Sequence, residues 1–267
     1  MDLKRITSGL IVGLAVVVIL LIPNNFIISI LLALIAIVAM DEYLRAISKV
    51  CKPIKWIGYL SCIIVALINF IPKQYLLSIL IFSIPSMLLI LFAQIIATDM
   101  KTTFKDAAYT FLGICYIPAF IMFLSLINGM NNGKILLGYV LIAAWGTDIF
   151  AYSIGCRFGK HKFSKVSPKK SIEGCVAGTL GATAVMLIYT FILNTWFSFE
   201  YSYFIIGITG IVLSLIGQLG DFSASCIKRY VDIKDYSNLL PGHGGMLDRI
   251  DSVLFIAPFA YMLFSIL

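Results

Sequence analysis

The 267-residue chain is 61% hydrophobic and only 12% charged, and its mean hydropathy is +1.02. A soluble globular domain carries roughly twice that charged fraction, so the composition excludes a soluble protein and indicates an all-α polytopic membrane protein. The net charge of +7 gives no reason to expect a nucleic-acid partner, and six scattered cysteines and two histidines fit neither a disulfide framework nor a histidine-rich metal centre.

Apolar stretches predict about nine transmembrane helices, since about 20 helical residues cross the hydrocarbon core of a bilayer. The expected helices cover residues 6–22, 26–41, 56–72, 75–97, 108–128, 135–155, 173–193, 203–225 and 250–267. The first stretch follows a basic start, as in a signal peptide. It lacks a small-residue cleavage site and turns at Pro23 into the second stretch, which favours a retained helical hairpin.

The distribution of positive charge predicts the topology. With the N-terminus in the cytoplasm, the cytoplasmic segments are 1–5, 42–55, 98–107, 156–172 and 226–249. They contain every Lys and Arg except Lys73 and Lys134, as the positive-inside rule demands. We therefore expect the C-terminus outside and loops 156–172 and 226–249 on the cytoplasmic face.

The polar chemistry is concentrated in the second half of the chain. Residues 1–106 are expected to form about four transmembrane helices that serve as scaffold or dimerisation region. Residues 107–267 are expected to form about five more, which make up the catalytic region.

The sixth predicted helix carries a polar stripe. Trp145, Asp148 and Tyr152 recur at helical spacing and share one face. A carboxylate within hydrocarbon needs a partner or a bound ion, so Asp148 is a candidate binding residue. The alternative is a carboxylate paired with a neighbouring helix for packing specificity alone.

Loop 156–172 combines glycines with basic residues and ends in a predicted helix N-terminus. Pro168 before it and Glu173 just after it are typical of a helix start, where backbone N–H groups and lysines bind phosphate. Topogenic positive charge alone is the alternative, and His161 is expected to be a loop residue without a ligand role. The residues expected to bind substrate are Lys169, Lys170 and Ser171.

The eighth predicted helix ends in a second polar set. Asp221, Ser225 and Lys228 recur at i, i+4 and i+7 on one face, and Arg229 follows them. A carboxylate, a hydroxyl and cations at the cytoplasmic end of a helix suit a site for phosphate and metal. The alternative is an intrahelical pair of Asp221 with a snorkelling Lys228.

Loop 226–249 and the start of the last helix form the most polar part of the chain. Its glycines permit backbone conformations in which N–H groups approach phosphate closely. Asp248 and Asp251 lie three residues apart, on one face of the final helix. The other candidate binding residues in this region are Lys234, His243, Gly244, Gly245 and Arg249.

The aspartates predict a magnesium site. Asp221 and Asp248 flank the same loop and are expected to converge, with Asp251 one turn deeper. Mg²⁺ takes one or two carboxylates together with substrate phosphates, and it would stabilise the charge developing on a leaving pyrophosphate. An ionised phosphate needs no Ser-His-Asp or Cys-His arrangement to act as nucleophile, so positioning and electrostatics would carry the catalysis.

The polar run as a whole resembles a known family signature. From Ser225 to Asp251 it reads S-x-I-K-R-x4-K-D-x-S-x2-L-P-x-H-G-G-M-x-D-R-I-D, which resembles the full signature of the phosphatidate cytidylyltransferases, the CDP-diacylglycerol synthases. The stripe around Asp148 and the GK…SPKKSxEG segment are also similar to that family. One departure is Ala177, where the family pattern has glycine.

This resemblance implies an enzyme of phospholipid biosynthesis that transfers the cytidylyl group of CTP to phosphatidate, giving CDP-diacylglycerol and pyrophosphate. It would act at the cytoplasmic side of the cell membrane, in bacteria the inner membrane, as a homodimer. The resemblance implies Mg²⁺, with a second, monovalent cation such as K⁺, at Asp221 and Asp248. Basic residues would surround the triphosphate or the lipid phosphate. The residues with catalytic roles would be Asp221, Lys228, Arg229, Asp248 and Asp251.

Other functions would use part of the same pattern. A CTP-dependent enzyme for another lipid, an isoprenoid-lipid cytidylyltransferase or a polyprenol kinase, should lack the complete 225–251 run. A transporter for an anionic solute would place its charges near the midplane, between repeated half-helices, whereas these charges gather toward the cytoplasm. A non-catalytic scaffold would have no use for two aspartates beside a glycine loop.

Overall fold

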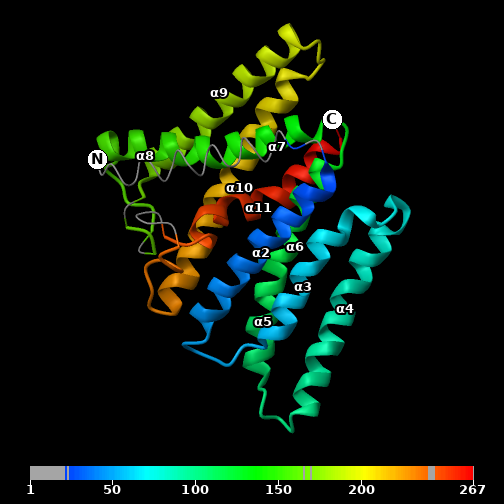
Figure 1. Cartoon of the computed structure of the whole chain (residues 1–267). Helices are drawn as coiled ribbons and strands as arrows, with labels where there is room; N and C mark the ends of the chain where they lie inside the picture. Colours follow the sequence, from blue (N-terminus) through cyan, green and yellow to red (C-terminus); the bar gives the residue numbers. More distant parts are fainter. Residues whose placement is uncertain (1–21, 23, 165, 169, 240–243, 267) are drawn as a thin grey trace. The chain divides into compact units, whose positions relative to one another are not determined.

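The computed structural model describes residues 22, 24–164, 166–168, 170–239 and 244–266. The described residues are helical and contain no strand (Figure 1), so the predicted all-α class is confirmed. The elements in order are α2 (Asn25–Ile47), α3 (Lys55–Leu67), the 3₁₀ turn η1 (Ile68–Phe70), α4 (Lys73–Ala97), α5 (Phe104–Tyr116), α6 (Pro118–Asn128), α7 (Gly133–Leu141), the π turn η2 (Ile142–Gly146), α8 (Thr147–Phe158), α9 (Ile172–Trp196), α10 (Tyr203–Tyr230) and α11 (Leu247–Phe264).

Several of these helices are long and apolar enough to cross a membrane, which agrees with the predicted membrane-protein class. Within the described ranges there are six: Asn25–Ile47, Gln74–Ala97, Phe104–Asn128, Gly133–Phe158, Ile172–Trp196 and Tyr203–Tyr230. Segment Lys55–Phe70 is apolar but shorter. The predicted helix 6–22 lies outside the described residues, so the total of nine stays a prediction.

Local sequence explains where several helices begin. Asn24 caps α2 by accepting a hydrogen bond from the Phe26 N–H at 2.9 Å. At α5, Thr103 and Asp106 form a reciprocal capping box, in which the Asp106 carboxylate accepts from the Thr103 N–H at 2.8 Å. Pro118 occupies the first position of α6, where the missing N–H costs nothing. The predicted helix 108–128 is therefore built from two consecutive helices.

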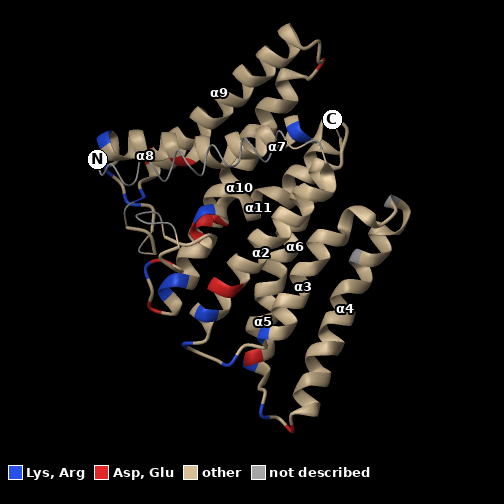
Figure 2. Ribbon diagram, in the orientation of Figure 1, with Lys and Arg blue, Asp and Glu red and all other residues tan. Residues whose placement is uncertain are grey.

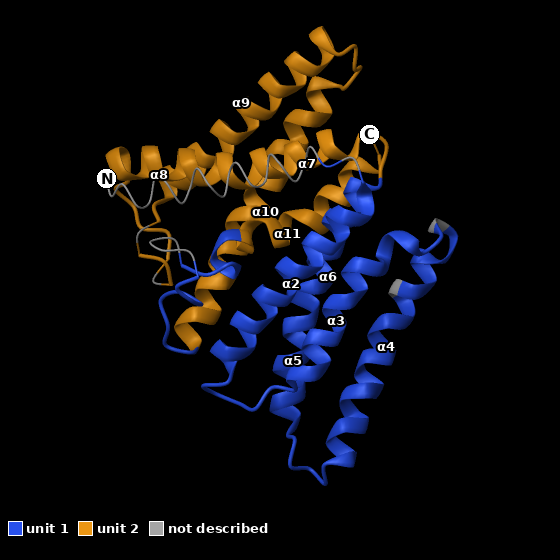
Figure 3. Ribbon diagram, in the orientation of Figure 1, with its two compact units in different colours: residues 1–129, 231–249 blue, residues 130–230, 250–267 orange. Residues whose placement is uncertain are grey.

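The chain forms two compact units, coloured separately in Figure 3. Unit 1 comprises the described part of residues 1–129 together with Val231–Arg249. Unit 2 comprises residues 130–230 together with the chain from Ile250 onward. The polar segment after α10 therefore packs with the N-terminal helices, although it follows α10 in sequence. The functional division at residue 106 stays a prediction.

Polar segments gather at one end of unit 1, where Figure 2 shows the charged residues of α2 and α5. The loop after α2 contacts the start of α5, because the Lys52 N–H donates to Asp106 Oδ1 at 2.6 Å. The Lys49 ammonium lies 3.5 Å from the carbonyl oxygen of Asp232. Three segments that were predicted to share one membrane face, 42–55, 98–107 and the part of 226–249 that belongs to unit 1, thus lie together.

Glycines bring α8 and α9 into close contact in unit 2. A Cβ atom on Gly174 would lie 2.8 Å from the carbonyl oxygen of Ala151, and one on Gly178 would lie 2.8 Å from that of Thr147. The two backbones therefore approach directly, as they do at small-residue interfaces between membrane helices. Gln218 then ties α10 to α9 by donating to Thr179 Oγ1 at 2.9 Å. This packing places the loop between α8 and α9 beside the end of α10.

We expect Gly178→Ala to destabilise the protein, because the added methyl group would collide with the Thr147 carbonyl. Overpacking of this kind lowers the free energy of unfolding by about 1–3 kcal/mol. Gly207→Ala in α10 is the matched control, since its methyl group would meet only Leu187 Cδ2, at 4.0 Å. Thermal unfolding in detergent should show a lower midpoint for G178A alone. Equal midpoints for the two variants would contradict the close packing of α8 on α9.

Candidate active site

Asp251 lies within electrostatic range of aspartates from two other helices of unit 2. Asp251 in α11 interacts with Asp221 of α10 and Asp148 of α8, and also with Lys228. Asp251 is buried, Asp221 is half-buried and Asp148 is exposed. The prediction that Asp221 and Asp251 belong to one site fits this arrangement, and Asp148 joins them as a third carboxylate.

Lys170 connects the basic loop with the end of α10. Its ammonium forms an ion pair with Asp221 and lies 4.6 Å from the centre of the Phe222 ring. Phe163, from the same basic loop, stacks on the Phe222 ring, and the two ring centres lie 4.7 Å apart. The partner that the structure gives Asp221 thus comes from loop 156–172, and two polar sets predicted separately form one site.

Ser171 caps α9, which confirms the predicted helix start. Its hydroxyl accepts a hydrogen bond from the Gly174 N–H at 3.2 Å, and the side chain is buried. Gly159 packs against it so closely that a Cβ atom there would collide with the hydroxyl. His161 contacts Glu173 through Nδ1 at 2.6 Å, as suits a loop residue. Lys169 lies outside the described residues. Lys170 contacts Asp221, a candidate metal ligand.

The polar stripe of the sixth predicted helix runs across a π turn. Trp145 lies within η2 and is half-buried, whereas Asp148 and Tyr152 are exposed on α8. A π turn holds more residues than an α turn and shifts the positions that share a face. Asp148 and Tyr152 therefore keep the predicted spacing within α8, and Trp145 is offset from them.

The predicted polar face at the end of α10 is present on a continuous helix. Asp221, Ser225 and Lys228 follow one another along one side of α10, which extends to Tyr230. Ser225 is buried and Lys228 half-buried. Arg229 is exposed, and its Nε lies 3.5 Å from the carbonyl oxygen of Val166 in the basic loop.

In unit 1, Asp248 organises the loop that precedes α11. Its Oδ2 accepts hydrogen bonds from the N–H groups of Tyr236 and Gly245, both at 2.9 Å. Gly244 has a φ of +81°, a left-handed conformation that glycine adopts without strain. The Gly245 N–H, a predicted phosphate donor, thus bonds to Asp248 within the loop. The convergence of Asp248 with Asp221 stays a prediction.

The other candidate residues of this loop differ in exposure. Lys234, Asp235 and Arg249 are exposed, so their side chains are open to a charged ligand. His243 lies outside the described residues.

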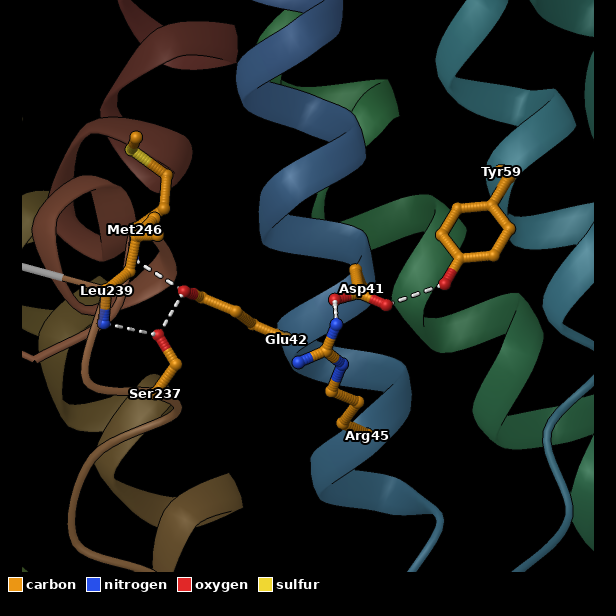
Figure 4. A network of polar contacts seen from close by, with 7 residues as sticks. All are labelled: Asp41, Glu42, Arg45, Tyr59, Ser237, Leu239 and Met246. Carbon is orange, nitrogen blue, oxygen red and sulfur yellow. Dashed lines mark hydrogen bonds and ion pairs between the residues drawn. The ribbon is translucent and has the colours of Figure 1, made fainter.

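Glu42 is a buried carboxylate that was not among the residues predicted from the sequence. It belongs to α2 and is hydrogen-bonded to the same loop of unit 1 (Figure 4), through Ser237, Met246 and Leu247. The only signal in the sequence is an acidic residue at the end of an apolar helix. Its partners are about 200 residues further along the chain, and no local pattern identifies them.

The carboxylates suit a hard divalent cation. In the part of the chain that the structure describes, no three His, Cys, Asp or Glu side chains form a ready-made metal-binding group. Mg²⁺, however, usually takes only one or two carboxylates and completes its shell with water and substrate phosphates. Asp221 and Asp251 provide such a pair of hard oxygen donors, and the cations around them suit an accompanying polyanion. The donor set thus fits a magnesium ion that binds together with a phosphate ligand.

Comparison with known proteins gives matches over nearly the whole chain. The sequence model of the cytidylyltransferase family matches residues 3–267. The phosphatidate cytidylyltransferase of Bacillus subtilis is 32% identical over 99% of this chain and 98% of its own length. The enzyme of that name from Thermotoga maritima is 35% identical over 67% of this chain and 66% of its own. The phosphatidate cytidylyltransferase of Staphylococcus haemolyticus is 31% identical over 84% of this chain and 85% of its own length.

These matches include both units and agree with the resemblance seen in the segment from Ser225 to Asp251. They extend it to the N-terminal helices, where no signature was identified from the sequence. The chain belongs to the cytidylyltransferase family.

Proposed function

We propose that this protein transfers the cytidylyl group of CTP to phosphatidate, giving CDP-diacylglycerol and pyrophosphate for phospholipid biosynthesis. The observation that carries this function is the ion pair of Lys170 with Asp221 beside Asp251. It combines phosphate-binding and metal-binding groups at the end of an apolar helix. Membership of the cytidylyltransferase family supports CTP as the nucleotide. The names of the relatives support phosphatidate as the acceptor.

The reaction requires two mutually repelling anions to meet. A phosphate oxygen of phosphatidate attacks the α-phosphorus of CTP, and the bond from that phosphorus to the α–β bridging oxygen breaks to release pyrophosphate. Lys170, Lys228 and Arg229 stand around the end of α10 and would hold the two anions together. Because the lipid phosphate is already ionised near neutral pH, the protein's contribution is mainly positioning and charge stabilisation.

We propose Mg²⁺ as the cofactor, with a second, monovalent cation such as K⁺ beside it. Asp221 and Asp251 of unit 2 and Asp248 of unit 1 are the proposed ligands, and Asp148 lies close enough to Asp251 to interact with it. When bound, Mg²⁺ would neutralise charge on the triphosphate and on the leaving pyrophosphate.

Further contacts to the two substrates are proposed for the remaining polar residues. Ser225 is buried on the same face of α10 as Asp221. The exposed side chains of Lys234 and Arg249 extend from the loop of unit 1. Gly244 and Gly245 shape that loop. Lys169, Ser171 and His243 stay predicted contacts to the triphosphate or the lipid phosphate.

We further propose that the site faces the cytoplasm of the cell membrane, with the N-terminus inside and the C-terminus outside. The co-location of segments 42–55 and 98–107 at one end of unit 1 supports a single polar face, and CTP is a cytoplasmic nucleotide. The homodimer implied by the family resemblance stays a prediction.

We expect Asp221→Asn and Asp251→Asn to reduce formation of CDP-diacylglycerol by at least about 100-fold, since each removes a charge that stabilises the transition state. Labelled CTP, Mg²⁺ and phosphatidate with the detergent-purified protein provide the assay, and EDTA should abolish activity. Glu200→Gln is the control, because Glu200 is an exposed acid just before α10, and the start of α10 lies about five helical turns from Asp221. Robust turnover in both aspartate variants would refute the metal assignment. Product formed from a polyprenol substrate but not from phosphatidate would refute the acceptor.

We expect Lys170→Ala to lower kcat/KM by about 30-fold or more, because a charge-assisted contact of this kind contributes about 2–3 kcal/mol. Lys162→Ala is the matched control: Lys162 is an exposed cation of the same loop. If the two variants lost activity equally, the loop would contribute only general positive charge. Steady-state rates at several phosphatidate concentrations distinguish these outcomes.

We expect loop 156–172 and the turn between α9 and α10 to lie on opposite membrane faces. In a variant that lacks the native cysteines, a membrane-impermeant maleimide should label K162C only in inverted vesicles. The same reagent should label E200C only in right-side-out vesicles or intact cells. Labelling of both positions from one side would contradict the topology.

A further inference from the structure

We propose that Glu42 is a positioning residue for the reaction, and that its carboxylate is the reason that residue 245 is glycine. Glu42 lies in α2, a helix of the N-terminal region, remote in sequence from every residue assigned above. This role rests on the proposed function, because the loop that Glu42 holds contains Asp248 and Gly245.

The carboxylate of Glu42 joins α2 to the loop before α11 by three hydrogen bonds, all within unit 1. Its Oε1 accepts from the Ser237 hydroxyl at 2.6 Å and from the Met246 N–H at 2.9 Å, and its Oε2 accepts from the Leu247 N–H at 2.8 Å. Figure 4 shows the side chain extending from α2 toward this loop. Both ends of the loop segment 237–247 are thus bonded to one side chain.

Two of these donors belong to the start of α11. The first N–H groups of a helix have no partner within it, and a side-chain acceptor at the residue before the helix usually satisfies one of them. Here that residue is Met246, whose side chain has no oxygen to accept a hydrogen bond. The carboxylate of Asp248, inside the helix, accepts from the Gly245 N–H and so does not cap these groups. Glu42 therefore takes the place of the missing cap. Its negative charge is also favourable at the positive end of the helix dipole.

Burial makes this contact difficult to replace. Glu42 is only 3% exposed, and a buried carboxylate is costly unless hydrogen bonds satisfy it. An amide in its place would direct N–H donors toward backbone N–H donors. The loop and the carboxylate consequently depend on each other.

Gly245 packs directly on the Glu42 carboxylate. A Cβ atom at position 245 would lie 2.6 Å from Glu42 Oε2 and 2.7 Å from both Cδ and Oε1. Gly244 has the left-handed φ of +81°, whereas Gly245 has no such conformation. The two adjacent positions thus require glycine for different reasons. Position 244 requires it for the left-handed backbone conformation, and position 245 requires it because a side chain there would collide with the Glu42 carboxylate.

The consequence for the reaction follows from the position of the capped N–H groups. Met246 and Leu247 immediately precede Asp248, a proposed metal ligand, and Arg249, a proposed phosphate contact. Loss of the Glu42 carboxylate should therefore displace this part of the site. The Mg²⁺ requirement should change, which a purely stabilising residue would not cause.

Asp41 provides a matched control on the same helix. It is the neighbouring acid, and it bonds to Arg45 at 2.5 Å and to the Tyr59 hydroxyl at 2.7 Å. In Figure 4 Tyr59 lies on the side of α2 away from the loop, and Arg45 lies along α2 itself. Asp41→Asn thus removes a carboxylate from the same turn of α2 without touching the loop.

We expect Glu42→Gln to raise the Mg²⁺ concentration for half-maximal activity about tenfold and to lower kcat/KM for CTP by about the same factor, the size of effect typical of one lost hydrogen bond to a charged group. Asp41→Asn should change both by less than about twofold, as expected for a partly exposed ion pair. Glu42→Asp, which keeps the charge, should recover part of the loss. An unchanged Mg²⁺ requirement in Glu42→Gln, or a loss that follows only the folded fraction, would overturn the proposal.

A double-mutant cycle tests the contact itself. Gly245→Ala should lower the thermal midpoint and the activity of the full-length protein, and most of this loss should disappear when Glu42 is replaced by Ala. Gly244→Ala should be equally harmful with Glu42 present or absent, because its cost comes from the left-handed backbone and from the nearby Asp248 carboxylate, and Glu42 is not among the nearest neighbours of the added methyl group. If Glu42→Ala does not fold, Glu42→Asp, one methylene shorter, takes its place in the cycle. Additive effects of positions 42 and 245 would overturn the proposal.

The two readouts separate this inference from the proposed function. If the wild-type protein forms no CDP-lipid from CTP and phosphatidate, the proposed function fails. The coupling of positions 42 and 245 can still be measured in the thermal midpoints. If the wild type is active and the coupling is absent, only the positioning role of Glu42 fails.

Discussion

A carboxylate at the edge of a hydrocarbon layer is stable only where the protein supplies it with donors or cations. The polar chemistry of this protein depends on how that requirement is met. In unit 1, Glu42 and Asp248 accept hydrogen bonds from the backbone of one loop and fix its shape. In unit 2, Asp221 is paired with Lys170. In the proposed reaction, the same contacts that make the charges tolerable would also hold them in place for catalysis.

Close helix packing makes these contacts available. In unit 2, glycines such as Gly178 let the backbone of α9 approach that of α8 closely. The loop that joins the two helices then ends in the Ser171 cap, one residue after Lys170. An ammonium group consequently reaches α10 from a rigid helix start, which suits a group that must hold a phosphate in one position.

Much of this arrangement could be predicted from the sequence, because hydrophobic length, capping residues and charge asymmetry are local properties. The helix start at Ser171 and the polar face from Asp221 to Lys228 are of this kind. Glu42 could not be predicted, because its role depends on tertiary contacts with residues 195 to 205 positions away. The π turn that offsets Trp145 has no recognisable local signal. Pro118, in contrast, is a signal from which the break between α5 and α6 could have been predicted.

The ion pair of Lys170 with Asp221 also has a thermodynamic consequence. The two charges neutralise each other, so an anion that takes Lys170 leaves Asp221 without its counter-charge, and a cation that takes Asp221 does the same to Lys170. Each ligand binding alone would therefore leave one uncompensated charge in the site, and the second ligand would neutralise that charge. By linkage, the binding of metal and of phosphate should be mutually cooperative. In the proposed reaction, a site built in this way would select the metal–nucleotide complex over either component alone.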